Sequence, residues 1–450
     1  NCKIELIMRL LTVLILAFFF NNCSFDDKSG IWKNENFNSS EKKAPGSFDG
    51  FEKLSTESDI FDKVLPIESE YRINFLKPET TNSWNDIFFS KSNNSKNFSF
   101  SEKNQINFRS KKVTKHNINE YILYADNNVI TSDEKGNLIV FSTTKNKIIV
   151  KFNFYKKKYK KFKKYLNLYV ENNLVYVSDN LGYLYAYDFE KSKVIWAKNY
   201  KIPFRGNLKI FKNKLITSDQ NNSLYIFDKL NGEVIRLIPT EETIIKNEFK
   251  NNISIFDNNL FFINTFGSIY SINLNNLSIN WFINLNETVN LNPGNLFDGS
   301  EIVSSKNKIL VSSEYFTYVL DSFSGSIIYK VNFSSQTRPI LFEDHLFLIT
   351  RNNLLLVMNL ANRKIIFSSD INQDISNYLN IKKYSVKIKS LNILQNQIYI
   401  FLKNSYYIKY NLSGKIDYIN KLPSKINSQL IFINNKIAFL DFKNKINLID

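Results

Sequence analysis

Three aspartates are the residues of this sequence best suited to acid–base chemistry. Asp188, Asp228 and Asp321 each end a short apolar run, in "LYAYD", "LYIFD" and "TYVLD". A carboxylate that recurs at one position of a repeated unit is expected to form a turn, because an Asp side chain accepts hydrogen bonds from the backbone two residues on. We therefore predict no catalytic residue among them and no enzymatic activity.

The sequence contains few residues that could ligate a metal ion or a redox cofactor. The two histidines, His116 and His345, have no neighbouring ligand pattern, and the two cysteines are Cys2 and Cys23. Zinc and haem sites need clustered His and Cys residues. His345 follows a polar pair and is predicted to begin a strand at the surface. The sequence predicts no metal site and no cofactor.

A basic segment, "YKKKYKKFKKY" at 155–165, is the strongest local charge feature. Interleaved lysines and aromatics bind single-stranded nucleic acid or anionic lipid headgroups in other proteins. A solvated lysine-rich connection is the simpler interpretation and is the one we favour. The net charge of +17 would attract anionic partners, but Lys and Asn are abundant throughout, and the export signal described below argues against nucleic acid.

These residues belong to a unit that recurs eight times after residue 100. Each copy has a polar turn pair, a strand, a second turn, and a strand that ends in Ser, Asp or Asn. The second strands end at 142, 188, 228, 273, 321, 359, 411 and 450, with an average spacing of 44 residues. This period, with strands in each unit, is typical of propeller blades. We predict an all-β fold, an eight-bladed β-propeller of four-stranded antiparallel blades over 101–450.

Turn chemistry and ring closure follow from the same repeat. Asn tolerates the left-handed conformation of hairpin turns, and pairs such as Asn127-Asn128 precede the strands of a chain with only 12 glycines. The second strand of each unit is expected to be the third of four strands in its blade, and in the eighth unit this strand ends at Asp450. An unpaired edge is unfavourable, so residues 105–111 are predicted to supply the outer strand of the last blade and close the ring.

The beginning of the chain has the pattern of an export signal. Arg9 precedes an apolar run from Leu10 to Phe20, which suits a secretory signal peptide and is too short to span a bilayer. We predict a signal peptide over 1–22, with translation starting at Met8. Cys23 follows directly and resembles the acylated cysteine of bacterial lipoproteins, although Asn22 departs from the small residue usual before it. Residues 23–100 are predicted to be a largely irregular tether.

The repeat carries a family resemblance. The segments "GYLYAYDFEKSKVIW" at 182–196 and "SLYIFDKLNGEVI" at 223–235 resemble the quinoprotein-like propeller repeat. Combined with the lipoprotein-type signal, the whole of 101–450 is similar to the BamB family, lipoprotein subunits of the outer-membrane β-barrel assembly machine. The repeat is specific for the fold and weak for the function.

One loop adds a second, more specific similarity to this family. The loop "IPFRGN" at 202–207 resembles the family's loop that docks onto the POTRA domains of the barrel-forming subunit. The resemblance implies that Ile202 and Phe204 are apolar anchors, that Arg205 is the cation, and that Gly206 lets the backbone turn. The alternative is an ordinary blade connection with a structural Arg. The family's acidic pair in the next such loop is not matched, since Glu248 stands alone in "NEFKNN" at 247–252. The loop and the basic segment are predicted to share one face of the disc.

The resemblance implies a non-catalytic scaffold at the periplasmic face of the outer membrane, held there by a lipid anchor. Its partners would be the POTRA domains and unfolded outer-membrane proteins, with no nucleic acid. One alternative is a periplasmic pyrroloquinoline quinone (PQQ)-dependent dehydrogenase, which in this fold needs a calcium site, a catalytic Asp and typically a vicinal disulfide. Another is a lipid-anchored propeller that binds polysaccharide or protein.

Overall fold

The computed structural model describes residues 24–25, 32–33, 61–67, 73, 75–242, 252–286, 297, 299–382 and 384–450. The chain divides into two units, Asn1–Thr56 and Glu57–Asp450. In the first unit, β1 (Ser24–Phe25) pairs antiparallel with β2 (Trp32–Lys33). The predicted signal peptide and Cys23 lie outside the described residues.

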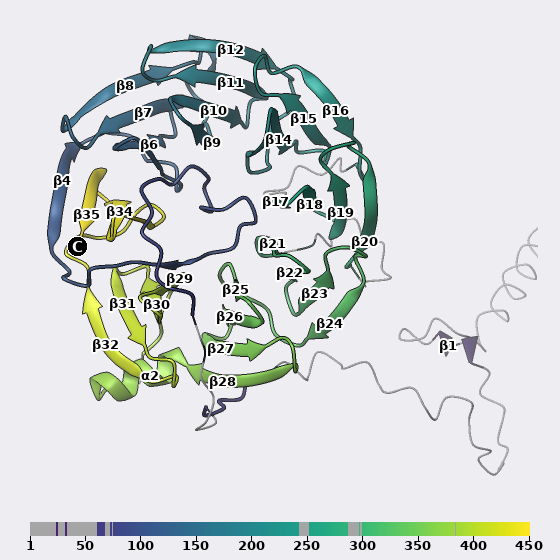
Figure 1. Cartoon of the computed structure of the whole chain (residues 1–450), viewed down its shortest axis with the longest axis vertical. Helices are drawn as coiled ribbons and strands as arrows, with labels where there is room; N and C mark the ends of the chain where they lie inside the picture. Colours follow the sequence, from purple (N-terminus) through teal and green to yellow (C-terminus); the bar gives the residue numbers. More distant parts are fainter. Residues whose placement is uncertain are drawn as a thin grey trace, which may run out of the picture. The chain divides into compact units, whose positions relative to one another are not determined.

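The second unit arranges eight sheets around a ring (Figure 1). Each blade has four antiparallel strands, a fifth strand, β3 (Asn97–Phe98), adds parallel to the seventh sheet, and the blades are numbered here in chain order. The first blade contains β5 (Leu123–Ala125), β6 (Asn128–Ser132), β7 (Asn137–Ser142) and β8 (Lys147–Asn153). The second contains β9 (Leu166–Glu171), β10 (Leu174–Asp179), β11 (Tyr183–Asp188) and β12 (Lys193–Asn199). The third contains β13 (Lys209–Phe211), β14 (Lys214–Ser218), β15 (Leu224–Asp228) and β16 (Val234–Ile238). The fourth contains β17 (Asn252–Phe256), β18 (Asn259–Ile263), β19 (Ser268–Asn273) and β20 (Ile279–Asn284).

The other four blades complete the ring. The fifth contains β21 (Val303–Ser304), β22 (Lys308–Ser312), β23 (Thr317–Asp321) and β24 (Ile327–Val331). The sixth contains β25 (Ile340–Phe342), β26 (His345–Ile349), β27 (Leu354–Asn359) and β28 (Lys364–Asp370). The seventh contains β29 (Ile388–Leu394), β30 (Gln397–Leu402), β31 (Tyr406–Tyr410) and β32 (Ile416–Lys421). The eighth contains β33 (Ile431–Ile433), β34 (Lys436–Leu440), β35 (Lys445–Ile449) and, as its outer strand, β4 (Ile106–Lys112).

The predicted eight-bladed propeller is therefore confirmed. Six of the eight third strands end at the predicted residue, and β31 and β35 end one residue earlier. In the inner three strands of a blade nearly every side chain is buried, whereas an outer strand such as β12 alternates between exposed and half-buried. The inner strands are covered on both faces by neighbouring blades, which explains their continuous apolar sequence. In every blade the register shifts between the third and the outer strand, a bulge that increases local twist.

Four of the predicted turn pairs place an Asn in the left-handed conformation, whereas in the third and fourth blades the positive φ falls one residue earlier, at Lys212 and Asp257. Asn127, Asn172, Asn396 and Asn434 have positive φ values between 48° and 62°. Gly182 has a φ of 85°, and a Cβ there would come within 2.9 Å of the Ile202 backbone. This turn thus requires Gly both for its conformation and for the close approach of the next connection.

Neighbouring blades are joined by the aromatic end of the repeat. Trp196, on the outer strand of the second blade, donates from Nε1 to the carbonyl of Lys229 in the third blade at 3.1 Å. A Cβ on Gly232 would lie 2.5 Å from the Trp196 ring. Trp281 makes the same contact with the fifth blade, donating to Ser322 at 3.2 Å. The Gly and Trp of the repeat are therefore the two sides of one blade-to-blade contact.

The connection after the sixth blade contains helix α2 (Ile371–Leu379), whose N-terminus is capped by the Asp370 side chain. Among the described residues, no helix is both long and apolar enough to cross a bilayer.

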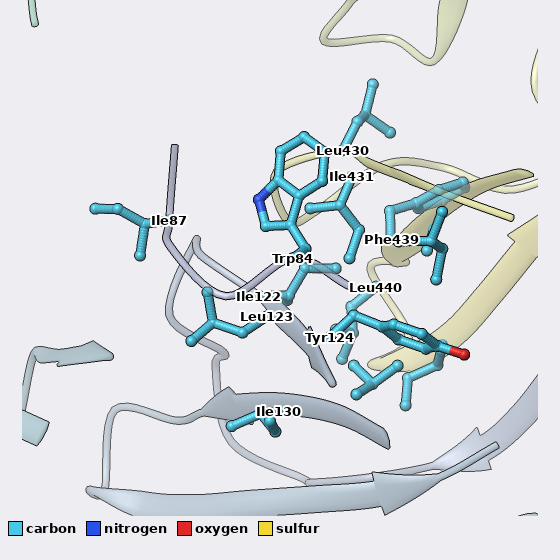
Figure 2. Packing of buried hydrophobic residues seen from close by; sticks show 14 of the residues in the cluster. Trp84, Ile87, Ile122, Leu123, Tyr124, Ile130, Leu430, Ile431, Phe439 and Leu440 are labelled. Atoms are coloured by element: carbon cyan, nitrogen blue, oxygen red, sulfur yellow. The ribbon is translucent and has the colours of Figure 1, made fainter. Parts of the chain in front are cut away.

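The boundary predicted at residue 100 lies too late in the chain. Residues 81–100, assigned from sequence to a tether, enter the ring (Figure 1), and five of their apolar side chains are no more than 6% exposed: Trp84, Ile87, Phe88, Phe98 and Phe100. Their strand β3 (Asn97–Phe98) pairs parallel with β29. Figure 2 shows Trp84 packed beside Leu430 and Ile431 of the eighth blade and near β5 of the first. These residues lack a regular period but are part of the core.

Candidate functional site

The connections between blades and the turns between second and third strands lie on one face of the ring, because each blade is a four-stranded meander. We call this the connection face; it includes residues 154–165, 200–207, 299–302, 333–338 and 423–430. Lys164 N donates to Glu134 O at 3.0 Å, and Phe204 N donates to Asp179 O at 3.0 Å. The basic segment and the 202–207 loop thus share this face, as predicted.

Phe204 does not have the exposure expected of an anchor. It is 2% exposed and packs against Tyr200, Tyr225 and Phe227 with ring centroids 6.0 to 6.1 Å apart. Its backbone forms a bridge with Asp219 of the third blade. The connection has to fill the gap between the second and third blades, and the aromatic ring fills it. The prediction that Phe204 contacts a partner is therefore corrected to a core role.

The other three residues predicted to contact a partner differ in their exposure. Ile202 and Arg205 are half-buried, whereas Gly206 is buried. Arg205 N donates to Ser218 O at 2.9 Å, which holds its backbone against β14. A Cβ on Gly206 would lie 2.3 Å from Ser218 Oγ. Gly206 is thus required by close packing of two chain segments, and Arg205 is the loop's charged group on the connection face.

Arg205 borders a central cavity of about 670 Å³. The lining comes from connections and turns of several blades and is mostly polar, with Asn207, Asn252, Asn264, Ser335, Gln336 and Arg351 among its residues. Glu301 is its acidic residue, and Ile87 and Phe88 contribute apolar surface from the N-terminal segment. Burial, followed by the negative charge of Glu301, raises the pKa of Tyr121 far above its usual value, so this phenol stays neutral. The cavity suits polar or anionic groups.

The segment 79–101 runs around the inner rim of the ring and bonds to the blades in turn. We call it the plug segment. Its backbone and side-chain bonds to inner strands are Thr81 Oγ1 to Phe432 O at 2.6 Å, Trp84 N to Tyr124 O at 2.7 Å, Val170 N to Asn85 O at 3.0 Å, Ile255 N to Lys91 O at 2.8 Å, Ser304 N to Ser92 O at 3.0 Å, and Asn94 Nδ2 to Leu341 O at 2.6 Å. With β3 beside β29 and an ion pair to β13, it reaches the inner strand of all eight blades. The protein's own chain therefore covers the inner strands of the ring and borders the central cavity.

The ion pair between Asp86 and Lys209 locks the plug segment to the third blade. The two side chains are 1% and 0% exposed, and their charged atoms are 2.7 Å apart. Lys209 Nζ also donates to Asn93 Oδ1 at 2.6 Å and Ser90 O at 3.2 Å, while Asp86 Oδ1 accepts from Phe88 N at 2.9 Å. Burial lowers the pKa of Lys209, and the charge of Asp86 opposes that effect. Every proton of the ammonium has an acceptor, as a buried charge requires.

The repeated aspartates are turn formers, as predicted. Asp188 Oδ1 accepts from Lys191 N at 2.8 Å, and Asp321 Oδ1 accepts from Ser324 N at 2.8 Å. The backbone N–H groups, that of Ser324 foremost, hold the pKa of Asp321 below its usual value. His345 begins β26, as predicted, and is half-buried. These carboxylates hold the backbone of turns and are not arranged around a reacting group.

Three solved structures share this architecture. BamB from Moraxella catarrhalis is 12% identical with a TM-score of 0.58, and the match covers 77% of this chain and 99% of that one. The quinohemoprotein alcohol dehydrogenase from Comamonas testosteroni is 11% identical with a TM-score of 0.59, covering 82% of this chain and 81% of that one. The chain shares the eight-bladed β-propeller fold of these proteins. A europium-containing methanol dehydrogenase is also similar, at 10% identity and a TM-score of 0.57, covering 81% of this chain and 88% of that one. Neither a protein-family model nor a curated protein matches the sequence.

A quinone cofactor of this fold would require a calcium site, and the residues of the cavity do not fit one. Calcium takes about six to eight oxygen ligands, in which carboxylates predominate. Among the residues that the structure describes, the cavity lining includes Arg205 and Arg351 and one carboxylate, that of Glu301. Within the described ranges, no group of three or more His, Cys, Asp or Glu could hold a metal ion. Among the described lining residues, two guanidinium groups and one carboxylate favour an anion over a divalent cation.

The sequence analysis did not predict that the plug segment is buried or that Asp86 pairs with Lys209. The available signals were a Lys in the inner strand "LKIF" and the apolar spacing of "SWNDIFF" at 83–89. A charged residue within a buried strand predicts a buried partner. It also missed a second set of repeated aspartates, Asp133, Asp179, Asp219 and Asp441, whose side chains accept backbone bonds in the turns of the connection face.

Proposed function

We propose that this propeller is a non-catalytic binding subunit of the outer-membrane β-barrel assembly machinery, and that it docks onto POTRA domains through the connection face. The observation that carries the proposal is the plug segment along the inner rim of the ring. It bonds to the inner strand of every blade, and among the described residues the central cavity beside it has Glu301 as its one carboxylate, fewer than a calcium site needs. Binding through surface loops is the function that this arrangement favours, and similarity to BamB over 99% of that chain supports the partner class.

Arg205→Ala is expected to weaken capture of purified POTRA domains by about 2 kcal/mol, or about thirtyfold in Kd, because buried Arg contacts are typical interface hot spots. Arg205 is the charged group of the 202–207 loop and borders the central cavity. Isothermal titration calorimetry of the two proteins measures the change. Arg236→Ala, at an exposed position of the outer strand β16, is the matched control and should bind like the unmodified protein.

Phe204→Ala separates docking from folding in the same experiment. Because Phe204 is buried among Tyr200, Tyr225 and Phe227, its removal leaves a cavity and is expected to lower stability rather than affinity. Normal capture by Arg205→Ala would contradict docking through this loop. Loss of capture by Phe204→Ala in a fully folded sample would restore the original anchor hypothesis.

The proposed location is the periplasmic face of the outer membrane, reached through acylation of Cys23. Its position directly after the apolar run Leu10 to Phe20 motivates this proposal. Cys23→Ser is expected to move the protein from the membrane fraction to the soluble periplasmic fraction, since acyl chains provide stable anchoring. Mass spectrometry of the N-terminal peptide measures the modification directly. An unmodified mature N-terminus at another residue would exclude the anchor.

A periplasmic dehydrogenase is the second candidate, and the similarity to two dehydrogenases is the observation that favours it. Purified protein incubated with calcium and pyrroloquinoline quinone provides the test. Quinone absorbance that remains after gel filtration would favour this function over a scaffold.

A further inference from the structure

Two aromatic side chains project from the basic loop, residues 155–165. Phe162 is 58% exposed and Tyr165 is 59% exposed. Around them stand the exposed lysines Lys156, Lys157, Lys160, Lys161 and Lys163. Charged side chains are sufficient to keep a connection solvated. Solvation therefore does not explain why two aromatic side chains are exposed on this loop.

The loop is held in place by bonds to two blades. Its short 3-10 helix η2 (Lys157–Tyr159) is followed by Lys164, which is 1% exposed and whose ammonium donates to Tyr159 O. Lys164 N donates to Glu134 O of the first blade at 3.0 Å. Asn180 of the second blade accepts from Tyr165 N at 2.9 Å and donates to Lys163 O at 3.1 Å. Phe162 and Tyr165 therefore stand on a preorganised backbone.

The outward field of the loop is positive. No acidic residue occurs between Glu134 and Glu171 in the sequence. The carboxylates beneath the loop, Asp133 and Asp179, are 0% exposed and engaged in hydrogen bonds, Asp179 with the Tyr155 hydroxyl. Positive charge on this surface is thus not neutralised by exposed acidic groups of the loop itself.

We propose that the basic loop is a membrane-surface site that binds the phosphate groups of anionic phospholipids. The lysines pair with headgroup phosphates, and the rings of Phe162 and Tyr165 enter the interfacial layer, where amphipathic aromatic groups are favoured. A single-stranded nucleic acid would need a groove that tracks its backbone. No residue of the loop lines the central cavity, and the side chains of Phe162 and Tyr165 are more than half exposed. The geometry therefore favours a lipid surface over nucleic acid.

Vesicle flotation tests this site with the full chain carrying Cys23→Ser, so that no acyl chain contributes. The expected result is binding about tenfold stronger to vesicles in which phosphatidylglycerol replaces about a third of the phosphatidylcholine than to phosphatidylcholine alone. Phe162→Ser/Tyr165→Ser should weaken that binding by about tenfold. Lys160→Gln/Lys161→Gln should weaken it and reduce its sensitivity to salt.

Matched controls lie on the opposite face of the ring. Phe323→Ser removes an aromatic that is 66% exposed in the β23–β24 turn, and Lys145→Gln/Lys147→Gln removes two exposed lysines of the β7–β8 turn. Both should bind vesicles like the parent chain. Equal binding to the two vesicle types, no binding, or unaffected binding by the Phe162/Tyr165 variant would overturn the proposal. Binding of a single-stranded oligonucleotide without vesicle binding would assign the loop to nucleic acid, and neither outcome alters the Arg205 docking test.

Discussion

Asp86→Ala is expected to lower the free energy of unfolding by about 3–5 kcal/mol, because it leaves the ammonium of Lys209 buried without its counter-charge. Both side chains are at most 1% exposed, so water does not replace the lost partner. The plug segment would lose its ion pair to the third blade and the bond from Phe88 N that orders its turn. Denaturant unfolding followed by circular dichroism measures the change.

The matched variant Asp86→Ala/Lys209→Met removes both charges. It is expected to recover much of the lost stability, because no uncompensated charge remains and the methionine fills the space of the lysine stem. If the single and double variants are equally unstable, the loss comes from packing of the plug segment and not from the charge.

The pH dependence of Asp86→Ala provides a second readout. Burial already lowers the pKa of Lys209, and without Asp86 the pKa falls further. The unfolded chain then holds more protons than the folded one at any pH between this lowered pKa and the ordinary pKa of lysine. Stability therefore rises with pH in that window. A flat profile from neutral to alkaline pH would contradict a buried, titrating Lys209.

The architecture was predictable because each blade repeats a local pattern. Six of the eight third strands end in Ser, Asp or Asn, and positive φ values occur at Asn127, Asn172 and Asn396, where the sequence supplies Asn. Such signals depend on a few neighbouring residues. The aspartates that end strands were interpretable for the same reason, since Asp188 and Asp321 bond to their own turns.

The centre of the ring was not predictable in the same way. The plug segment has no period, and its partners lie between about 40 and more than 300 residues away, as Trp84 with Tyr124 and Thr81 with Phe432 illustrate. The burial of Phe204 depends on the gap between two blades, which no local pattern specifies. A family resemblance is therefore least reliable for predicting which side chains of a blade-to-blade connection are exposed.

Replacement of β4 by seven Gly and Ser residues is expected to cost about 4 kcal/mol of stability, because it removes the hydrogen-bonded ladder to β35. The pairing aligns Phe108 with Leu448 and Arg109 with Asn447, and Arg109 Nη2 bonds to Asp441 at 2.9 Å. Thermal unfolding monitored by circular dichroism, with light scattering, measures both stability and aggregation. The same replacement in β8, also seven residues and also an outer strand, is the control.

The two replacements differ in what they do to the ring. Loss of either outer strand exposes the edge of a third strand, β7 or β35. Loss of β8 leaves the first blade joined to the second through the connection 154–165, whereas loss of β4 leaves the plug segment to join the last blade to the first. An exposed edge strand promotes aggregation. β4 on the outside and the plug segment on the inside both join the last blade to the first. Asp86→Ala releases the same plug segment from the third blade, so combining it with the β4 replacement should destabilise by more than the sum of the two. Equal effects of the β4 and β8 replacements, without aggregation, would show that β4 does not close the ring.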